Sequence, residues 1–401
     1  MKLDYPTSWA RRPLGDVCKQ YRGVTYKKGD ARSEPTSGFI PILRANNIEA
    51  ARLIPNDLVY VPQDLVKDTQ RLRKGDVVIA ASSGSLDVVG KAAQADGDWD
   101  GSFGAFCKLL RPDASLVDPS FFGYFFETQF YRFAISRLAA GANINNLRNE
   151  HLDAMPFPCP PRPEQDRLGR VMRSADNIRR KRQAVICKAS TLIPAVFCDL
   201  FGSISGQTSR WPLVQLGDCC RDIETVDPTK APTEEFTYID IASINTTEGR
   251  VESPQTLIGE NAPSRARQKV HADDVLVSTV RPNLRQTAMV PKKHDGQVCS
   301  TGFAVLRPAP DKLDPLYLYT ITRDPWFTNT LVSMTSGANY PAVRHKDVFT
   351  VRVPVPPIAL QREFAKKAKA VHQLQDRMRE AAKESDNLFH SLVQRAFKGE
   401  L

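Results

Sequence analysis

The sequence predicts an α+β chain in which two pseudo-symmetric β-rich domains are separated by two long antiparallel coiled-coil helices. Three observations predict this fold class. They are a repeat with a period near two hundred residues, short β-branched segments in each copy, and a heptad-like series of apolar residues closing each copy. The 401 residues are enough for two to three domains, and 41% hydrophobic residues can form sizeable cores.

The repeat is visible as short matches that recur in order. Gly141-Ala142-Asn143 recurs as Gly337-Ala338-Asn339, and Pro160-Pro161 with Gln165 recurs as Pro356-Pro357 with Gln361, each 196 positions later. Towards the N-terminus the offset grows to 202, between Leu14-Gly15-Asp16 and Leu216-Gly217-Asp218. One dipeptide can match by chance, but an ordered series indicates one duplicated unit.

Each copy begins with a β-rich part. Short strands are predicted at Phe39–Ile42 and Tyr238–Ile241, and β-branched strands at Asp76–Ala80 and Asp274–Ser278. An aromatic-rich helix is then predicted from 119 to about 138 in the first copy and from 315 to about 334 in the second. These aromatic side chains are interpreted as core.

A long helix closes each copy, directly after a Pro-Pro pair that suits helix entry. Pro194 should bend or end the first helix. Two seams of matched length in one pseudo-twofold chain predict antiparallel pairing. The alternative is that each helix packs on its own globular half. The predicted seam positions are 168, 171, 175, 178, 185, 189, 192 and 196, and then 364, 371, 374, 378, 381, 388 and 392.

Charge and composition limit the class of protein. The net charge of +10 and the pI near 9.2 favour a polyanionic partner. The sequence contains no run of about 18 apolar residues, so it predicts no membrane span. The N-terminal residues also lack the apolar stretch of a secretion signal. The eight cysteines include no Cys-x-x-Cys pair, so we expect reduced structural thiols in a cytoplasmic protein.

Motifs for covalent chemistry are absent from the sequence. It contains no phosphate-binding Gly-x-x-x-x-Gly-Lys-Ser/Thr loop, no Gly-x-Gly-x-x-Gly, no Asp/Glu-x-Lys and no Asn-Pro-Pro-aromatic motif. The histidines show no His-x-x-x-His pair. We therefore expect no catalytic residue and no metal site in this chain.

Polar loops that follow the predicted strands are the candidate binding residues. Arg can grip guanine and Asn can grip adenine through paired hydrogen bonds, although phosphate contact and local turn capping remain alternatives for the same residues. A glycine-containing loop in each copy, followed by Asn residues and a basic residue, forms a second candidate pair. The candidates for DNA binding are Ser82, Ser83, Ser85, Asn145, Asn146, Arg148, Arg281, Asn283, Arg285, Asn339, Tyr340 and Arg344.

These features together resemble the specificity subunit of type I restriction-modification systems. The resemblance lies in the duplicated Pro-Pro…Gln helix entries, the two long helices, the segment Ser278–Arg285, and the ending Arg395–Leu401. It covers nearly the whole chain, and the order of the repeats is reproduced as well.

The resemblance implies the domain organisation and the partners. Residues 1–160 and 206–357 would be target recognition domains, and residues 161–205 and 358–401 the spacer helices. The domains would read the two parts of a split, asymmetric double-stranded DNA target, while the paired helices fix the gap between the parts and dock two modification subunits. Two restriction subunits would join the complex. S-adenosylmethionine, ATP and Mg would be bound by those partners, and this chain would hold no cofactor.

Two other functions remain open from the residues alone. One is a self-sufficient DNA methyltransferase or nuclease, which the missing motifs argue against. The other is a non-catalytic scaffold whose helices carry the function and whose loops are ordinary surface.

Overall fold

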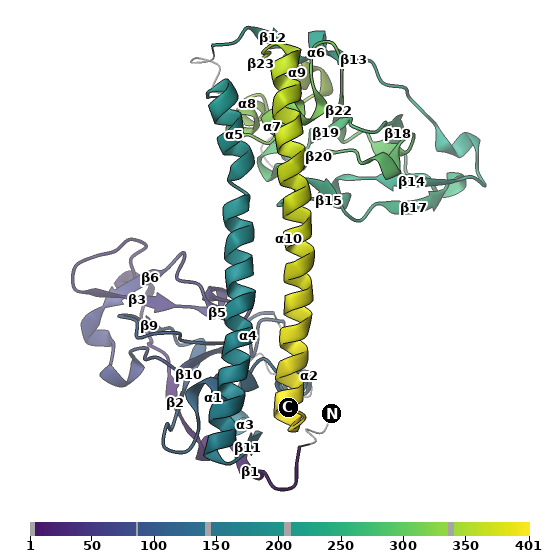
Figure 1. Cartoon of the computed structure of the whole chain (residues 1–401). Coiled ribbons are helices and arrows are strands. Elements are labelled where there is room, and N and C mark those ends of the chain that lie inside the picture. Colours follow the sequence, from purple (N-terminus) through teal and green to yellow (C-terminus); the bar gives the residue numbers. More distant parts are fainter. Residues whose placement is uncertain (1–4, 86, 141–145, 204–209, 336–340) are drawn as a thin grey trace. The chain divides into compact units, whose positions relative to one another are not determined.

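The computed structural model describes residues 5–85, 87–140, 146–203, 210–335 and 341–401. The chain divides into two compact units. The first unit comprises Met1–Val185 and Met378–Leu401, and the second comprises Ile186–Arg377. Each unit combines a β-rich part with segments of the long helices (Figure 1). The α+β class predicted from the sequence is confirmed.

The first unit is built on a four-stranded antiparallel sheet in the order β2-β10-β7-β8. Its centre is β7, in which Val77, Val78 and Ile79 are buried on both faces, which explains its continuous β-branched run. Two strand pairs and a three-stranded sheet, β6-β3-β9, complete the β-rich part. The strands are β1 Ala10–Pro13, β2 Cys18–Arg22, β3 Phe39–Leu43, β4 Ile48–Glu49, β5 Arg52–Leu53, β6 Val59–Pro62, β7 Val77–Ala80, β8 Ala92–Gln94, β9 Ser102–Phe103, β10 Cys107–Pro112 and β11 Pro156–Cys159.

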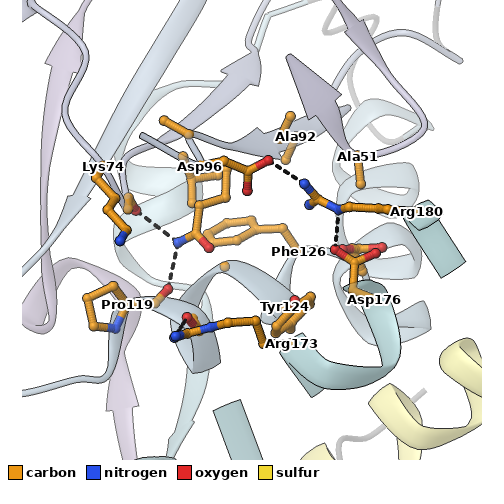
Figure 2. Close-up of a pocket in the computed structure, with 18 of the residues that line it drawn as sticks. Ala51, Lys74, Ala92, Asp96, Pro119, Tyr124, Phe126, Arg173, Asp176 and Arg180 are labelled. Carbon is orange, nitrogen blue, oxygen red and sulfur yellow. Dashed lines mark hydrogen bonds and ion pairs between the residues drawn. The ribbon is translucent and has the colours of Figure 1, made fainter. Parts of the chain in front are cut away.

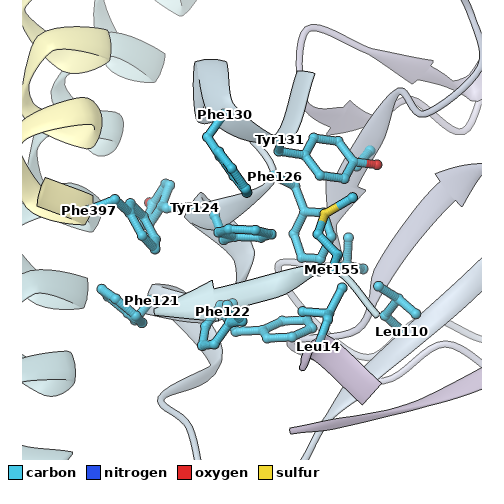
Figure 3. Packing of buried hydrophobic residues seen from close by; sticks show 14 of the residues in the cluster. Leu14, Leu110, Phe121, Phe122, Tyr124, Phe126, Phe130, Tyr131, Met155 and Phe397 are labelled. Atoms are coloured by element: carbon cyan, nitrogen blue, oxygen red, sulfur yellow. The ribbon is translucent and has the colours of Figure 1, made fainter. Parts of the chain in front are cut away.

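The predicted aromatic helix of the first copy is two helices, α1 (Pro119–Phe125) and α2 (Gln129–Ala140), followed by α3 (Asn149–Asp153). Thr128 causes the break, because its hydroxyl accepts the N–H of Tyr131 and so caps a new helix. The aromatic residues form the core, as predicted. Phe397 from the C-terminal helix lies in the same core and stacks on Phe121 with ring centroids 4.5 Å apart (Figure 3).

The second unit repeats this plan with longer sheets. Its six-stranded sheet has the order β13-β22-β19-β20-β16-β15, and a four-stranded sheet has the order β17-β14-β21-β18. The strand predicted at Tyr238–Ile241 ends earlier, at Ile239, because the Asp240 side chain accepts the N–H of Ser243 and starts a turn. The strands are β12 Leu213–Gln215, β13 Cys220–Arg221, β14 Glu235–Ile239, β15 Ile244–Asn245, β16 Arg250–Val251, β17 Gln255–Ile258, β18 Ala266–Lys269, β19 Val275–Ser278, β20 Thr287–Met289, β21 Val298–Ser300, β22 Phe303–Pro308 and β23 Arg352–Pro354.

The predicted aromatic helix of the second copy is also divided, by Asp324-Pro325. The Asp324 carboxylate accepts the N–H of Trp326, and the proline occupies the first position of the new helix. The helices of this part are α6 Leu216–Cys219, α7 Pro315–Thr322, α8 Pro325–Ser333 and α9 His345–Thr350.

The long helices are α4 (Arg162–Ala189), α5 (Leu192–Phe201) and α10 (Ile358–Lys398). The interruption between α4 and α5 confirms the effect predicted for Pro194, which has no N–H to donate to the carbonyl four residues earlier.

Within each unit the long helices run antiparallel, as their contacts show. In the first unit, the Arg167 side chain donates to the carbonyl of Leu401 at 2.7 Å, and Arg182 donates to that of Ala381 at 2.8 Å. In the second unit, Gln375 donates to the carbonyl of Ala189 at 2.8 Å. Higher residue numbers on one helix therefore meet lower numbers on the other.

The predicted apolar seam is only partly buried. Leu168 and Ala189 are buried. The exposed seam residues are Val171, Ile178 and Val185 of α4, Leu192 of α5, and Leu374 and Leu388 of α10. The prediction is wrong at these positions because each helix turns another face to its neighbours, where Met172 and Asp176 of α4 are buried, for example. Residues of α4, α5 and α10 also lie in the globular cores. The long helices therefore pack both on each other and on the globular parts, so neither of the two predicted packing modes describes them completely.

One helical stretch within the described residues, Arg162–Phe201, could cross a membrane by length and composition alone. Its apolar window has a mean hydropathy of 1.7, with 17% of the window buried. The sequence prediction counted uninterrupted apolar residues and so did not find it. A single such helix is weak evidence for a membrane span, and its Phe197 and Phe201 lie in the hydrophobic core of the second unit.

The same buried polar contacts recur in both units, which supports the duplication. Arg111 pairs with the buried Asp76 at 2.7 Å, and Arg307 pairs with the buried Asp274 at 2.9 Å. Two glutamines repeat in the same way. Gln165 accepts the N–H of Asp118 and donates to the carbonyl of Pro160, and Gln361 makes the same bonds with Asp314 and Pro356.

Candidate nucleic-acid interface

The first candidate edge follows strand β7 and joins two loops that the sequence analysis proposed separately. Ser82 forms a β-bridge with Asn146, and the carbonyl of Ala81 accepts the N–H of Leu147 at 2.7 Å. Ser85, Asn146 and Arg148 are exposed, whereas Ser82 and Ser83 are half-buried. Asn145 lies outside the described residues. We call Ser82–Ser85 with Asn146–Arg148 the first edge.

The second candidate edge follows strand β19 and has the same construction. Val280 forms a β-bridge with Ala342, and the N–H of Arg281 donates to the carbonyl of Pro341 at 2.8 Å. Arg281, Asn283 and Arg285 are exposed. Asn339 and Tyr340 lie outside the described residues. We call Arg281–Arg285 with Pro341–Arg344 the second edge.

The arginines of the second edge sit on a strained backbone. Arg281 (φ 48°) and Arg285 (φ 52°) are both left-handed and flank a 3₁₀ turn at Pro282–Leu284. A left-handed residue other than glycine costs about 1 kcal/mol, and such strain is concentrated at functional sites. The turn holds two guanidinium-bearing residues four positions apart at an exposed edge, which suits contact with base edges or phosphates.

The guanidinium of Arg344 is already engaged by a carboxylate. It contacts both carboxylate oxygens of Asp347, at 2.8 and 3.0 Å. These hydrogen bonds hold the pKa of Asp347 below its usual value. Arg344 would have to exchange this partner to grip a base.

A third segment supports each edge, and the sequence analysis missed it. The carbonyl of Phe106 accepts the N–H groups of Ala81 and Ser82 at 2.8 and 3.0 Å. In the second unit the carbonyl of Gly302 accepts the N–H and the hydroxyl of Thr279, both at 2.9 Å. Phe106 and Gly302 lie 196 positions apart, which is the offset of the repeat. An alignment of the two copies would therefore have shown a phenylalanine in the first copy where the second has a glycine.

A cavity of about 530 Å³ lies where the first unit's sheet meets α4. Figure 2 shows its ion pairs: Arg180 bonds both Asp96, from the loop after β8, and the buried Asp176, at 2.6 Å. Glu127 also lines the cavity, and burial raises its pKa to about 7 although Arg179 opposes the shift. These charges pair with one another. The ion pair of Arg180 with Asp96 therefore attaches the β-rich part to α4.

The equivalent cavity of the second unit has a volume of about 760 Å³. Here Arg250 from β16 bonds Asp376 of α10 at 2.5 Å. The helix supplies the anion and the β-rich part supplies the cation, which is the reverse of the first unit.

The side chains that could bind a metal or react as thiols have the following arrangement in the described parts of the chain. Among those residues, no group of three or more His, Cys, Asp or Glu side chains could hold a metal ion. All eight cysteines are free. Burial raises the pKa of Cys18, Cys107 and Cys220 to about 12, which keeps these thiols protonated and unreactive.

The known proteins whose sequences resemble this chain are of one kind. The model of the type I restriction modification DNA specificity domain matches residues 6–187. The chain is 30% identical to the type I restriction enzyme EcoKI specificity subunit of Escherichia coli K12, covering 99% of this chain and 90% of that one. It is 29% identical to the StySPI specificity subunit of Salmonella potsdam, with the same coverage.

Solved structures show the same fold. The S subunit of a type I restriction-modification system from M. genitalium matches with a TM-score of 0.57 at 16% identity, covering 99% of this chain and 98% of that one. A chain from a type I R-M assembly matches with a TM-score of 0.55 at 19% identity, covering 99% and 100%.

Proposed function

Because the chain belongs to the specificity subunits of type I restriction enzymes, we propose that it reads a double-stranded DNA target in two unequal parts without catalysing a reaction itself. Family membership supports DNA target recognition. The two-part reading, the assignment of residues and the docking of partners are the steps that we add.

One observation carries the two-part reading: the two edges share a backbone construction but differ in side chains. Each edge is closed by a β-bridge between the loop after a central strand and a loop about sixty residues later. The first edge presents serines, Asn146 and Arg148, and the second presents Arg281, Asn283, Arg285 and Arg344. Because these groups suit different bases, two unlike edges select two unlike sequences.

We assign residues 1–160 and 206–357 to the two recognition domains. Residues 161–205 and 358–401 would be the spacer helices, which set the distance between the two parts of the target as half-site spacing does in dimeric proteins. The antiparallel helix contacts within each unit support this assignment.

The exposed apolar residues of the long helices support docking of the modification subunits. In the first unit Val171, Ile178 and Val185 recur every seven residues on α4, and Leu388 of α10 is 62% exposed. In the second unit Leu192 and Leu374 are exposed as well. Such a stripe is costly in water and is typical of a surface that another helix covers. The modification subunits would supply adenine methylation with S-adenosylmethionine, and restriction subunits would use ATP and Mg, all in the cytoplasm.

The docking surface can be tested with two substitutions on α4. Ile178→Asp should prevent co-purification of the modification subunit, while the chain stays folded because this side chain is 54% exposed. Ala184→Asp places the same charge on an exposed position of α4 outside the stripe, and should leave the complex intact. Equal recovery of the complex with both variants would contradict the docking proposal.

DNA reading is tested by sequencing the methylome of cells that carry this chain and its modification subunit. We expect a split, asymmetric motif with methylated adenine. Arg281→Ala or Arg285→Ala should relax one part of the motif and weaken binding by about 1–3 kcal/mol per lost guanine contact. Arg352→Ala, an exposed arginine on β23, serves as the control. A complex without sequence preference would refute the proposal, and methyl transfer by the chain alone would show that it is itself an enzyme.

A further inference from the structure

Two apolar side chains stand out on the surface of the β-rich parts. Among the described residues outside α4, α5 and α10, Phe106 (70%) and Leu284 (47%) are the most exposed large hydrophobic side chains, and the others reach 40% at most. Phe106 belongs to the segment that supports the first edge, and Leu284 lies within the second edge. A scattered surface residue is ordinary, but the two highest exposures both fall at the candidate edges.

The backbone that carries Phe106 is held in place. The N–H of Gly104 donates to the carbonyl of Leu43 at 2.9 Å, and the N–H of Cys107 donates to that of Gly104 at 2.8 Å. Gly23 approaches so closely that a Cβ there would lie 2.1 Å from the Gly104 carbonyl oxygen. Phe103 and Cys107, on either side of the turn, are fully buried. The exposed ring is therefore presented by a fixed turn, so less conformational entropy is lost when it binds.

Leu284 is held at the surface by a different backbone structure from the turn that carries Phe106. It is the last residue of the 3₁₀ turn, directly before the left-handed Arg285. At the position equivalent to Phe106 the second unit has Gly302, which offers no side chain. Each unit thus presents one exposed apolar group at its edge, but from a different loop.

We propose that Phe106 and Leu284 are apolar base readers, each packing on the C5 methyl group of a thymine in its own part of the DNA target. This inference rests on the proposed function. Thymine is the base that offers a methyl group in the major groove, and apolar side chains, phenylalanine among them, recognise it by contact. Asn283 and Arg285 flank Leu284, and the carbonyl of Phe106 accepts the N–H of Ser82, so hydrogen-bonding and apolar readers share each edge. A target methylated on adenine contains A·T pairs and hence such methyl groups.

Deoxyuridine substitution tests the contact directly, because uracil pairs as thymine does but lacks the methyl group. The chain is purified with its modification subunit, and binding is measured on duplexes of the methylated motif in which each thymine in turn is replaced by deoxyuridine. The wild-type complex should lose about fourfold in affinity at one thymine in each part, the effect expected for one buried methyl group. Phe106→Ala should bind the thymine and deoxyuridine duplexes equally at one part, and Leu284→Ala at the other.

Phe133→Ala and Leu65→Ala are the matched controls, because these side chains are 40% and 39% exposed away from the edges. Both should keep the wild-type sensitivity to deoxyuridine. The inference is overturned if no single replacement matters, if a part has no thymine, or if Phe106→Ala still distinguishes the duplexes. It is also overturned if Phe106→Ala releases the modification subunit. If the inference fails but the wild-type complex still selects its motif, the proposed function stands. A wild-type complex without any sequence preference would refute both the inference and the proposed function.

Discussion

The two units attach their β-rich parts to the long helices with ion pairs of opposite polarity. In the first unit the helix contributes the cation Arg180 and the β-rich part contributes Asp96. In the second the helix contributes Asp376 and the β-rich part contributes Arg250. Deeper in each unit the chemistry is identical, with a buried Arg–Asp pair and a buried glutamine at matching places. The buried contacts thus define the shared fold, and the exposed contacts distinguish the copies.

The largest effects should come from the contacts that the two units share. Asp76→Ala and Asp274→Ala each leave an arginine without its buried partner, which should cost about 3–5 kcal/mol of unfolding free energy. The two aspartates are 1% and 2% exposed. Denaturant unfolding measures the loss, and hydrogen exchange assigns it to one unit. Asp100→Ala, from a surface pair with Arg71, should cost less than about 1 kcal/mol. Equal effects of all three variants would contradict the comparison.

Glu127 should make the first unit sensitive to pH. Its folded-state pKa of about 7 lies above the ordinary 4.5, so the folded state binds more protons between these values. The unfolding free energy should therefore fall as pH rises from 4.5 to 7, and the stability present below 4.5 is lost above 7.

Glu127→Gln should remove this slope and raise stability at pH 8 by roughly 3 kcal/mol, because a neutral amide avoids the cost of burying the charge. Urea unfolding at pH 5 and pH 8 measures the difference. Glu150→Gln, an exposed change on α3, is the control. A variant that is no more stable than the wild type at pH 8 would show that Arg179 compensates the buried charge.

The attachment pairs should respond differently to reversal. Asp376→Arg brings two cations together and should cost about 1 kcal/mol, since both partners are nearly half-exposed. Adding Arg250→Asp should restore most of the loss, because the other carboxylate near Arg250, that of Glu248, lies 3.8 Å away and is 34% exposed. In the first unit the matching double change, Asp96→Arg with Arg180→Asp, should not restore it, because Arg180 also neutralises the buried Asp176. Thermal unfolding of the single and double variants measures how much stability each double change restores. Equal restoration in the two units would contradict the difference that we expect between them.

The smallest expected effect concerns the strained turn of the second edge. The described residues of the first edge include none with a positive φ, whereas the second edge places Arg285 in the left-handed region. Arg285→Gly should raise stability by about 0.5 kcal/mol, as relief of strain exceeds the entropy that glycine adds to the unfolded chain. The same variant should bind DNA less tightly. A lower melting temperature would indicate that the arginine side chain stabilises the turn.

The repeated elements could be predicted from the sequence because they depend on local chemistry. The central strands, the Pro-Pro helix entries and the break at Pro194 follow from β-branched runs and from proline geometry. The loop residues Ser82 and Arg281 were also correctly grouped with their strands. Their partners across each edge were identified only as separate loops, because a β-bridge over sixty residues leaves no local signal.

Other features required three-dimensional information. The heptad pattern located the long helices but could not show which apolar residues are buried, since two globular cores compete with the opposite helix for the same faces. Phe106 was missed because an exposed aromatic and a core aromatic look alike in a sequence. The ion pair of Arg250 with Asp376 joins residues 126 positions apart, and surface charges carry no indication of their partners.

The position of Phe397 has a consequence for biosynthesis. When a ribosome has made the first two hundred residues, the first unit has its sheets and Phe121 but lacks the α10 side chains that close its core, Phe389, Val393 and Phe397. That unit can reach its native packing only after nearly all of the chain has been translated. The nascent N-terminal half therefore waits for the C-terminal helix with part of its aromatic surface exposed, a state that chaperones would shield.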